Sequence, residues 1–252
     1  MFIESVSHYG IFFFLGIVSS VFIAVVLGKK CGVDFFDYAC AAVYVMIGAI
    51  IGAKLLFVVV TWKDIMRLQL SLVEILQGGF VFYGGLLGGL LGLIVYSKQF
   101  KVDVKDYADI FATVLPLGHC FGRIGCTFAG CCYGIPYNGW GCICYKTATN
   151  VFTPTGVCLF PIQIIEAMVL LVLFGLLQCL FFRRKQKGNI ALIYLSTYAL
   201  LRFILEFFRG DTERGELLTL STSQWISIAL LCMTFIYWLK CRKGQIKNPH
   251  SV

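Results

Sequence analysis

Charged residues are scarce in this chain of 252 residues: 13% are Asp, Glu, Lys or Arg, whereas 59% are hydrophobic. A soluble domain has about 25% charged and about 45–50% apolar residues, so a single water-soluble core does not account for this composition. Disordered chains combine low hydrophobicity with high net charge, so that class is excluded as well. The chain also lacks low-complexity tracts and repeats of about 20–50 residues. The composition therefore indicates a membrane protein.

Acidic residues are the rarer charged class, with 13 Asp and Glu against 21 Lys and Arg and a net charge of +8. The basic residues form short clusters between long apolar runs. This pattern is typical of topology signals and contacts with anionic lipid, and not of a nucleic-acid surface. We therefore expect no nucleic-acid partner.

Seven apolar runs are long enough to cross a bilayer as helices, which takes about 17–25 residues each. The alternating pattern of a membrane β-barrel is absent. No Lys or Arg precedes the first run, which favours a first helix over a cleavable signal. The predicted fold is all-α: a polytopic bundle of seven transmembrane helices forming a single domain over residues 1–252. The runs are Gly10–Leu27, Tyr38–Thr61, Gly79–Ser97, Tyr107–Gly125, Pro161–Phe182, Asn189–Phe208 and Ser223–Leu239.

Lys and Arg divide unequally between the two sets of segments that connect these runs: 13 lie in one set and five in the other. Because basic residues are enriched in cytoplasmic loops, this asymmetry predicts an N-terminus outside the membrane and a C-terminus in the cytoplasm. The long connection at residues 126–160 is then an extracytoplasmic, Cys-rich loop.

A few charged residues fall within or at the edge of the apolar runs. A charge in hydrocarbon costs several kcal/mol, so such residues face a protein interior or pair with one another. There are six such residues, three basic and three acidic, which predicts that they pair with one another. The predicted topology puts five of them in the outer half of the membrane, where Tyr9 and Tyr83 also lie. The sixth, Asp109, belongs at the cytoplasmic end. The six are Lys54, Arg123, Arg202, Asp109, Glu166 and Glu206.

Two sequence patterns indicate a ligand in this outer half. Tyr198, Arg202, Glu206 and Arg209 share one helix face, because they are spaced by four, four and three residues, and such a polar stripe predicts a cavity. Elsewhere, glycines surround Arg123, and they permit close backbone approach to a group that the planar guanidinium binds. Together the patterns favour a phospholipid headgroup. By contrast, the glycines around Gly84 predict close helix packing.

Several spaced motifs resemble those of the bacterial prolipoprotein diacylglyceryl transferases. The segment from Gly122 to Gly134 has the length and the glycine–arginine frame of the family's G-R-x-G-N-F-I-N-x-E-x-x-G. The other motifs follow in the family's order. They are Tyr9-Gly10, Gly52-Ala53-Lys54-Leu55 (family G-A-R-L), Tyr83-Gly84-Gly85-Leu86 (H-G-G-L), Pro161 to Glu166 (P-x-Q-L-Y-E) and Tyr198 to Arg209 (Y-x-x-x-R-x-x-x-E-F-x-R).

The resemblance implies a multi-pass enzyme of the bacterial cytoplasmic (inner) membrane. A diacylglyceryl group would pass from phosphatidylglycerol to the lipobox cysteine thiol in a prolipoprotein signal peptide at the outer leaflet. No metal and no cofactor are expected. The implied catalytic residues are Arg123, Arg202, Glu166, Glu206 and Tyr83. The implied substrate-binding residues are Tyr9, Lys54, Gly84, Gly122, Gly125, Gly134, Gln163, Tyr198 and Arg209.

The chain departs from the family pattern at several of these positions. Tyr83 replaces a His that is proposed as a base, and Lys54 replaces an Arg, which loses bidentate geometry. Cys126 and Cys131 replace an Asn and the acidic residue of the signature. A relative that acts on another lipid or acceptor, an envelope thiol–disulfide oxidoreductase and a transporter or lipid-binding protein therefore remain as alternatives.

Cysteine is abundant, with 12 residues in the chain, and six of them fall in the predicted outward loop. Because an extracytoplasmic compartment permits disulfides, we expect the loop to be stapled. Free apolar cysteines and a metal site are the alternatives, although adjacent cysteines and Cys-x-Cys are not the usual zinc spacing.

Overall fold

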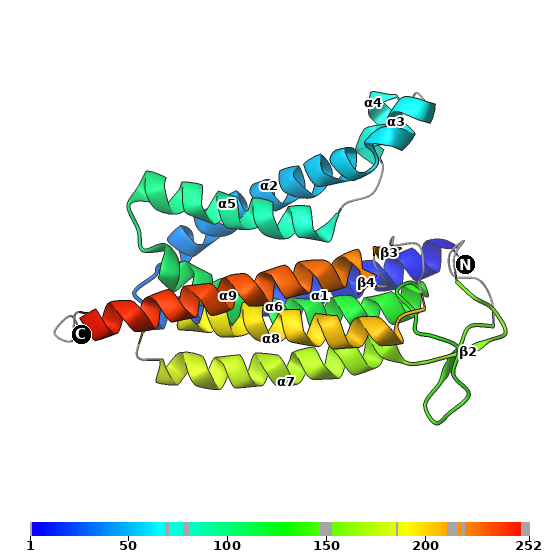
Figure 1. Cartoon of the computed structure of the whole chain (residues 1–252). Helices are drawn as coiled ribbons and strands as arrows, with labels where there is room; N and C mark the ends of the chain where they lie inside the picture. Colours follow the sequence, from blue (N-terminus) through cyan, green and yellow to red (C-terminus); the bar gives the residue numbers. More distant parts are fainter. Residues whose placement is uncertain are drawn as a thin grey trace. The chain divides into compact units, whose positions relative to one another are not determined.

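The structure is a computed structural model that describes residues 2–68, 71–77, 81–146, 153–184, 186–210, 216–217 and 220–247 (Figure 1). Nearly all regular structure in these ranges is helical. The chain divides into two compact units, one formed by residues 1–24 and 111–252 and the other by residues 25–110. The helices are α1 (Phe2–Lys30), α2 (Phe35–Val60), α3 (Trp62–Leu68), α4 (Leu72–Gln77), α5 (Phe82–Phe100), α6 (Val104–Ala129), α7 (Ile162–Arg183), α8 (Asn189–Leu205), η1 (Glu206–Phe208) and α9 (Thr222–Lys247).

Every predicted apolar run coincides with one or two of these helices. The run at 79–97 corresponds to α5, although its first two residues lie outside the described ranges. Five helices in the described part of the chain are long and apolar enough to span a membrane, which confirms the helical membrane class. They are His8–Lys30, Phe35–Val60, Ile162–Arg183, Asn189–Phe208 and Thr222–Lys240.

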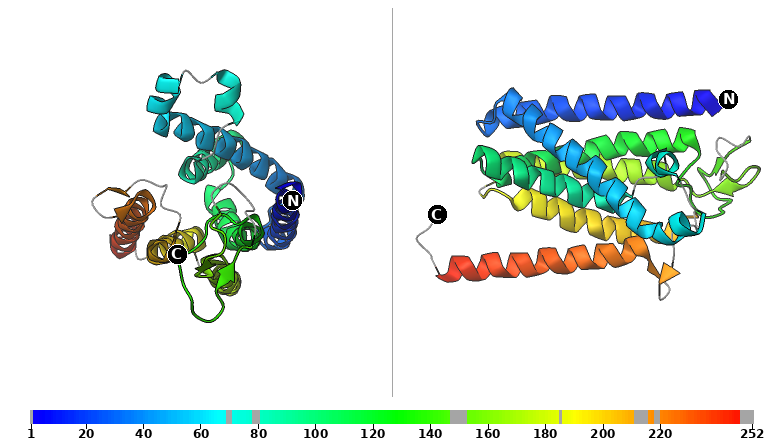
Figure 2. Two further views of the ribbon diagram at one scale, coloured as in Figure 1. Left: turned by 90° about the vertical axis from the view of Figure 1, so that its right-hand side faces the viewer. Right: turned by 90° about the horizontal axis from the view of Figure 1, so that it is seen from above.

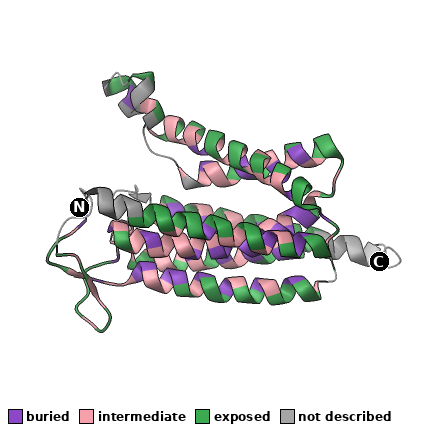
Figure 3. Ribbon diagram, turned by 180° about the vertical axis from the view of Figure 1, so that it is seen from behind, coloured by how far each residue is buried: buried purple, intermediate pink, exposed green. Residues whose placement is uncertain are grey.

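In the first unit, α6, α7 and α8 run alongside one another (Figures 1 and 2). Helix α7 is apolar over most of its length beyond Gln163 and Glu166. Leu170, Leu173 and Leu177 are buried on one face, whereas Leu171 and Val172 are exposed on the other (Figure 3). An apolar outer face is what a helix in contact with lipid requires, because acyl chains replace water as its solvent.

Small residues let α1 and α6 approach closely within the same unit. A Cβ added to Gly16 would lie 2.9 Å from Cβ of Phe121. Nearby, the hydroxyl of Ser20 donates a hydrogen bond of 3.4 Å to the carbonyl of Val114. Small and hydroxylated residues are the usual contact residues between membrane helices.

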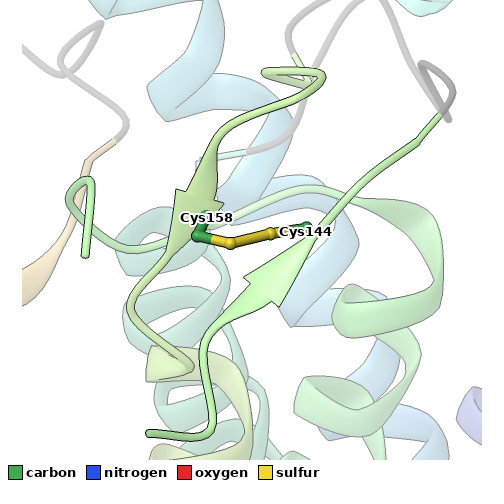
Figure 4. Close-up of a disulfide and its surroundings, with 2 residues drawn as sticks. All are labelled: Cys144 and Cys158. Atoms are coloured by element: carbon green, nitrogen blue, oxygen red, sulfur yellow. A yellow bond between two sulfur atoms is a disulfide. The ribbon is translucent and has the colours of Figure 1, made fainter. Parts of the chain in front are cut away.

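The segment between α6 and α7 carries a short antiparallel hairpin of β1 (Ile143–Cys144) and β2 (Cys158–Leu159). Cys144 lies opposite Cys158 in its register, and a disulfide joins them (Figure 4). The predicted disulfide staple in this loop is therefore confirmed. One boundary differs from the prediction: α6 continues to Ala129, so Cys126 is in the helix and not in the loop. A second hairpin pairs β3 (Glu216–Leu217) with β4 (Leu220–Ser221).

In the second unit, α2 and α5 pack through glycines, as the sequence predicted. A Cβ added to Gly84 would collide with the carbonyl oxygen of Gly52, and one added to Gly92 would collide with that of Tyr44. The backbone amide of Val81 also donates a hydrogen bond of 3.2 Å to the carbonyl of Ala53. The two helices are in backbone contact, which only glycine permits along this line.

Replacing Gly88 by valine should therefore separate α2 from α5. A Cβ at this position would collide with the carbonyl oxygen of Gly48 and lie 3.0 Å from Cα of Gly52. We expect a loss of about 1–3 kcal/mol in the free energy of unfolding, measured in detergent. Gly89→Ala is the matched control, because its Cβ would make only ordinary contacts with Val45 and Ala49. Equal stability of the two variants would contradict the backbone contact.

Candidate active site

The first charged pair of the site joins α6 to α7. Nη2 of Arg123 lies 3.0 Å from Oε1 of Glu166, and the Glu166 side chain is 3% exposed. Arg123 lies two turns before the end of α6, whereas Glu166 lies in the second turn of α7. A buried charge is tolerated only when a partner offsets its desolvation, so this ion pair fixes the ends of two helices relative to each other.

The second pair lies where α8 gives way to η1. Nη2 of Arg202 contacts Oε2 of Glu206 at 2.6 Å, and the same nitrogen donates to Oγ of Ser223 at 3.3 Å. Nη1 of Arg202 is buried and has no hydrogen-bond partner among the described residues. Buried donors are nearly always satisfied, so this nitrogen can donate a hydrogen bond to an oxygen from outside the described residues.

His119 on α6 contacts α8 and interacts with the arginine of each ion pair. Its ring packs on that of Tyr198, with centroids 5.4 Å apart, so α6 meets α8 here. His119 also interacts electrostatically with both Arg123 and Arg202. The sequence motifs alone did not assign His119 to the site. Its spacing of four residues from Arg123 on one helix is the signal that would have included it.

A backbone pairing brings Arg209 to the end of α6. The amide of Ile135 donates to the carbonyl of Phe208 at 3.1 Å, and the amide of Gly210 donates to that of Tyr133 at 3.0 Å. Between them, Gly134 forms an antiparallel bridge with Arg209. A Cβ on Gly134 would collide with the carbonyl of Phe160, so the pairing requires glycine at this position.

Two side chains fasten the loop after α6 to the helices beside it, Gln163 from α7 and Tyr145 from the loop itself. Gln163 is 2% exposed and donates from Nε2 to the carbonyl of Cys131 at 3.0 Å. Tyr145 donates from its hydroxyl to the carbonyl of Thr127 at 2.9 Å, and burial raises the pKa of the Tyr145 phenol to about 12. Gln163, which was predicted to bind substrate, thus orders the loop next to Arg123.

Tyr9 and the two glycines flanking Arg123 also belong to the first unit. The Tyr9 ring packs against α6, since a Cβ on Gly125 would lie 3.0 Å from its Cδ2 atom. At Gly122, by contrast, an added Cβ would meet no atom within 4 Å. Packing within the described residues therefore explains the glycine at position 125 but not the one at 122.

Three predicted site residues lie in the second unit. Nζ of Lys54 donates to the carbonyls of Ile75 at 3.2 Å and Leu76 at 3.1 Å, and so caps the end of α4. Gly84 packs on α2, and Tyr83 is half-buried in the first turn of α5. The remaining predicted site residues all lie in the first unit.

Three thiols form a cluster beside Arg123. The sulfur atoms of Cys126, Cys131 and Cys132 all lie within 4.8 Å of one another. Hydrogen bonds from the Cys126 and Cys131 thiols lower the pKa of the Cys132 thiol. The guanidinium groups of Arg209 and Arg123 lower it further. The sequence placed these cysteines in one loop but did not show that they converge.

The fold and the site together define a multi-pass membrane enzyme built around buried arginine–carboxylate pairs at one end of a helical bundle. The chain matches the family model for prolipoprotein diacylglyceryl transferase over residues 2–240, and it belongs to this family. The resemblance inferred from the motifs is thereby confirmed, as is the predicted transferase class. The oxidoreductase and transporter alternatives are set aside.

Curated relatives cover most of the chain. It is 34% identical over 223 residues to "phosphatidylglycerol--prolipoprotein diacylglyceryl transferase 2" of Clostridium perfringens, covering 88% of this chain and 86% of that protein. A Clostridium tetani enzyme named phosphatidylglycerol--prolipoprotein diacylglyceryl transferase is 34% identical and covers 87% of each chain. One of the same name from Dehalococcoides mccartyi is 30% identical, covering 96% of this chain and 93% of that protein.

The Arg123–Glu166 pair predicts strong coupling between the two positions. In a double-mutant cycle of Arg123→Gln and Glu166→Gln, the interaction free energy should be about 0.5–3 kcal/mol, because each single variant leaves a buried charge unpaired. Unfolding in detergent provides the measurement. Arg183 is exposed at the far end of α7, so a cycle of Arg183→Gln with Glu166→Gln should be additive within about 0.5 kcal/mol. Additivity in both cycles would contradict the ion pair.

Proposed function

We propose that this protein transfers a diacylglyceryl group from phosphatidylglycerol to the lipobox cysteine of a prolipoprotein. The reaction takes place at the outer leaflet of the bacterial cytoplasmic membrane. The names of the curated relatives support the donor and the protein acceptor. The observation that carries the proposal for this chain is a pair of arginines, Arg202 buried and Arg123 partly buried. Each is paired with a carboxylate, and both lie within electrostatic range of His119.

The chemistry requires stabilisation of a phosphate that gains charge. In phosphatidylglycerol the diacylglyceryl carbon is bonded to a phosphodiester oxygen. That C–O bond breaks as the acceptor sulfur forms a C–S bond, the thiol gives up its proton, and glycerol 1-phosphate leaves. The leaving group carries more negative charge than the diester. Arg123 and Arg202 offset this charge as it develops, which is the most effective use of fixed donors.

Glu166 and Glu206 serve the arginines first. Each carboxylate holds one edge of a guanidinium group, so the remaining N–H groups keep their direction toward the phosphate. A carboxylate in this position can also act as a general base toward the acceptor thiol, whose pKa is about 8.5 in water. The two carboxylates therefore orient the arginines and help to remove the acceptor proton.

The other motif residues are assigned to substrate binding. Arg209 lies within electrostatic range of Arg123, so both cations attract the same anion. Tyr9 and Tyr198 supply hydroxyls for lipid oxygens, while Gly122, Gly125, Gly134 and Gln163 shape the backbone around Arg123. Tyr83, Lys54 and Gly84 are assigned to the same reaction by the motif resemblance alone, with Tyr83 as a catalytic hydroxyl.

Seven membrane crossings and an outside N-terminus complete the proposal. Helices α5 and α6 supply the two crossings beyond the five long apolar helices. The disulfide in the loop between α6 and α7 supports an extracytoplasmic position for that loop, because disulfides persist in oxidising compartments. The basic cluster after α7 then lies in the cytoplasm, in agreement with the positive-inside rule.

Site-specific labelling tests this orientation. Trp140, which is 97% exposed in the loop, is replaced by cysteine in one variant, and the exposed Gln186 after α7 is replaced in another. A membrane-impermeant maleimide should modify position 140 in intact cells and position 186 only after permeabilisation. Mass spectrometry of the modified peptides separates these sites from the native cysteines. The opposite labelling pattern would contradict the proposed orientation and show that the N-terminus is in the cytoplasm.

Transfer from labelled phosphatidylglycerol to a lipobox peptide tests the function directly. Arg123→Ala or Arg202→Ala should reduce kcat by about 10²–10³-fold, the loss typical of removing one donor to a developing oxyanion. The Lys variants should recover only part of the rate, since lysine keeps the charge but loses the fork. Arg183→Ala, at the exposed end of α7, is the control and should be unaffected. Wild-type rates in folded Arg123→Ala and Arg202→Ala proteins would refute the proposal.

A further inference from the structure

The three-thiol cluster of Cys126, Cys131 and Cys132 lies at the end of α6, in sequence next to the Arg123 site. Cys126 belongs to the last turn of the helix, and the other two follow the turn that ends it. All three sulfurs lie within 4.8 Å of one another, and all three residues are partly buried. Partly buried sulfurs that converge from both sides of a turn form a potential ligand set.

The backbone that carries these sulfurs is fixed by hydrogen bonds from three directions. The amide of Cys131 donates to the carbonyl of Cys126 at 3.2 Å. Buried Thr153 donates to the carbonyl of Gly130 at 3.0 Å, and buried Gln163 donates to that of Cys131 at 3.0 Å. A cluster held in this way is preorganised, because its ligands need little rearrangement on binding.

The turn itself adopts a conformation that few residues accept. Gly130 has φ of 65° and Cys132 has φ of 57°, so a non-glycine residue lies in the left-handed region. Such a conformation is unfavourable for a residue with a Cβ and persists only where the surroundings enforce it. In this conformation the Cys132 sulfur lies within 4.8 Å of the Cys126 sulfur.

Sulfur is the ligand that soft d¹⁰ cations prefer, and zinc is the commonest of them in proteins. A Zn–S bond of about 2.3 Å in tetrahedral geometry places two sulfurs about 3.8 Å apart, so the observed cluster needs to contract only slightly. Three thiolates on Zn²⁺ carry a net charge of −1. The guanidinium groups of Arg123 and Arg209, both in electrostatic range of Cys132, offset that charge.

We propose that Cys126, Cys131 and Cys132 bind a soft metal ion of the zinc type, and that its open fourth position takes the acceptor thiol. Three protein ligands and one exchangeable position are the pattern of a zinc site that acts on a substrate, whereas structural zinc sites have four protein ligands. This inference rests on the proposed function, in which the acceptor is a cysteine thiol and Arg123 binds the donor phosphate.

The metal changes only one step of the reaction. The acceptor R–SH coordinates zinc and loses its proton to solvent or a carboxylate, because a metal-bound thiol is deprotonated. The resulting thiolate forms the C–S bond as the C–O bond to phosphate breaks, and the thioether product dissociates from the metal. No atom changes oxidation state, so the step needs no oxidant or reductant. The ion pairs and the metal then act on opposite partners of the same displacement.

Metal binding is tested on the full chain with Cys142, Cys144 and Cys158 replaced by serine, because a reductant would open the Cys144–Cys158 disulfide and expose a second group of three thiols. The protein is purified in detergent with a phosphine reductant. Titration with Zn²⁺ against a chromophoric chelator should give one tight site per chain. Replacing any one of the three cysteines by serine should weaken it by about tenfold or more. Cys120→Ser is the matched control, because Cys120 is on the same helix outside the cluster. Unchanged affinity in all three variants would overturn the proposal, as would a disulfide within the cluster in protein isolated without reductant.

Cobalt replaces zinc as a spectroscopic probe of the fourth position. Co²⁺ in the cluster should give thiolate-to-metal charge-transfer absorption, and a lipobox peptide should strengthen it, whereas the same peptide with serine for cysteine should not. An unchanged spectrum with the cysteine peptide would refute binding of the acceptor. This readout does not depend on catalysis.

Transfer assays separate failure of the metal site from failure of the function. With zinc removed by a chelator, transfer should fall by about tenfold or more and return when Zn²⁺ is added. Equal transfer with and without bound metal would overturn the role of the metal while the transferase function stands. Absence of transfer in both states, together with a peptide-dependent cobalt spectrum, would refute the proposed function and leave the metal site supported.

Discussion

The fold of the first unit depends on burying guanidinium groups among apolar helices. Arg123 and Arg202 cannot lie among apolar helices without partners, because an unpaired charge there costs several kcal/mol. Glu166 on α7 and Glu206 beside α8 meet that requirement, and His119 on α6 is within electrostatic range of both arginines. The Arg123–Glu166 pair therefore joins α6 to α7, and the hydrogen bond from Arg202 to Ser223 joins α8 to α9. Apolar packing along α7 and its neighbours determines how the rest of each helix lies.

Backbone contact is the corresponding constraint in the second unit. Helices α2 and α5 have few polar groups with which to recognise each other, so they associate where glycines remove the side chains between them. The same property of glycine serves a different purpose in the first unit. At Gly134, the missing side chain lets the loop after α6 form a backbone bridge with Arg209. Arg209, which follows η1, is thereby held near the site.

Sequence reasoning recovers those features that follow from local rules. The balance of buried charges predicted that the charged residues pair with one another, although it did not say that Arg123 pairs with Glu166. Helical periodicity put Arg202 on the same face as Glu206. The partner of Cys144 was not predictable, because it depends on the register of a hairpin with a long connection. The thiol cluster was missed for a related reason: α6 extends past its apolar run, and the left-handed turn after it redirects Cys132.

The hydrogen-bond arrangement of Arg202 shows why an ion pair at the site is compatible with binding a phosphate. A guanidinium group has five N–H donors. In Arg202, Nη2 pairs with the Glu206 carboxylate and donates to the Ser223 hydroxyl. Nη1 is buried and without a hydrogen-bond partner among the described residues, so an anion can bind it without displacing the carboxylate. A site in which the anion had to break the ion pair would lose much of the binding energy. Under the proposed function, the carboxylate would hold the guanidinium in place for the phosphate without competing with it.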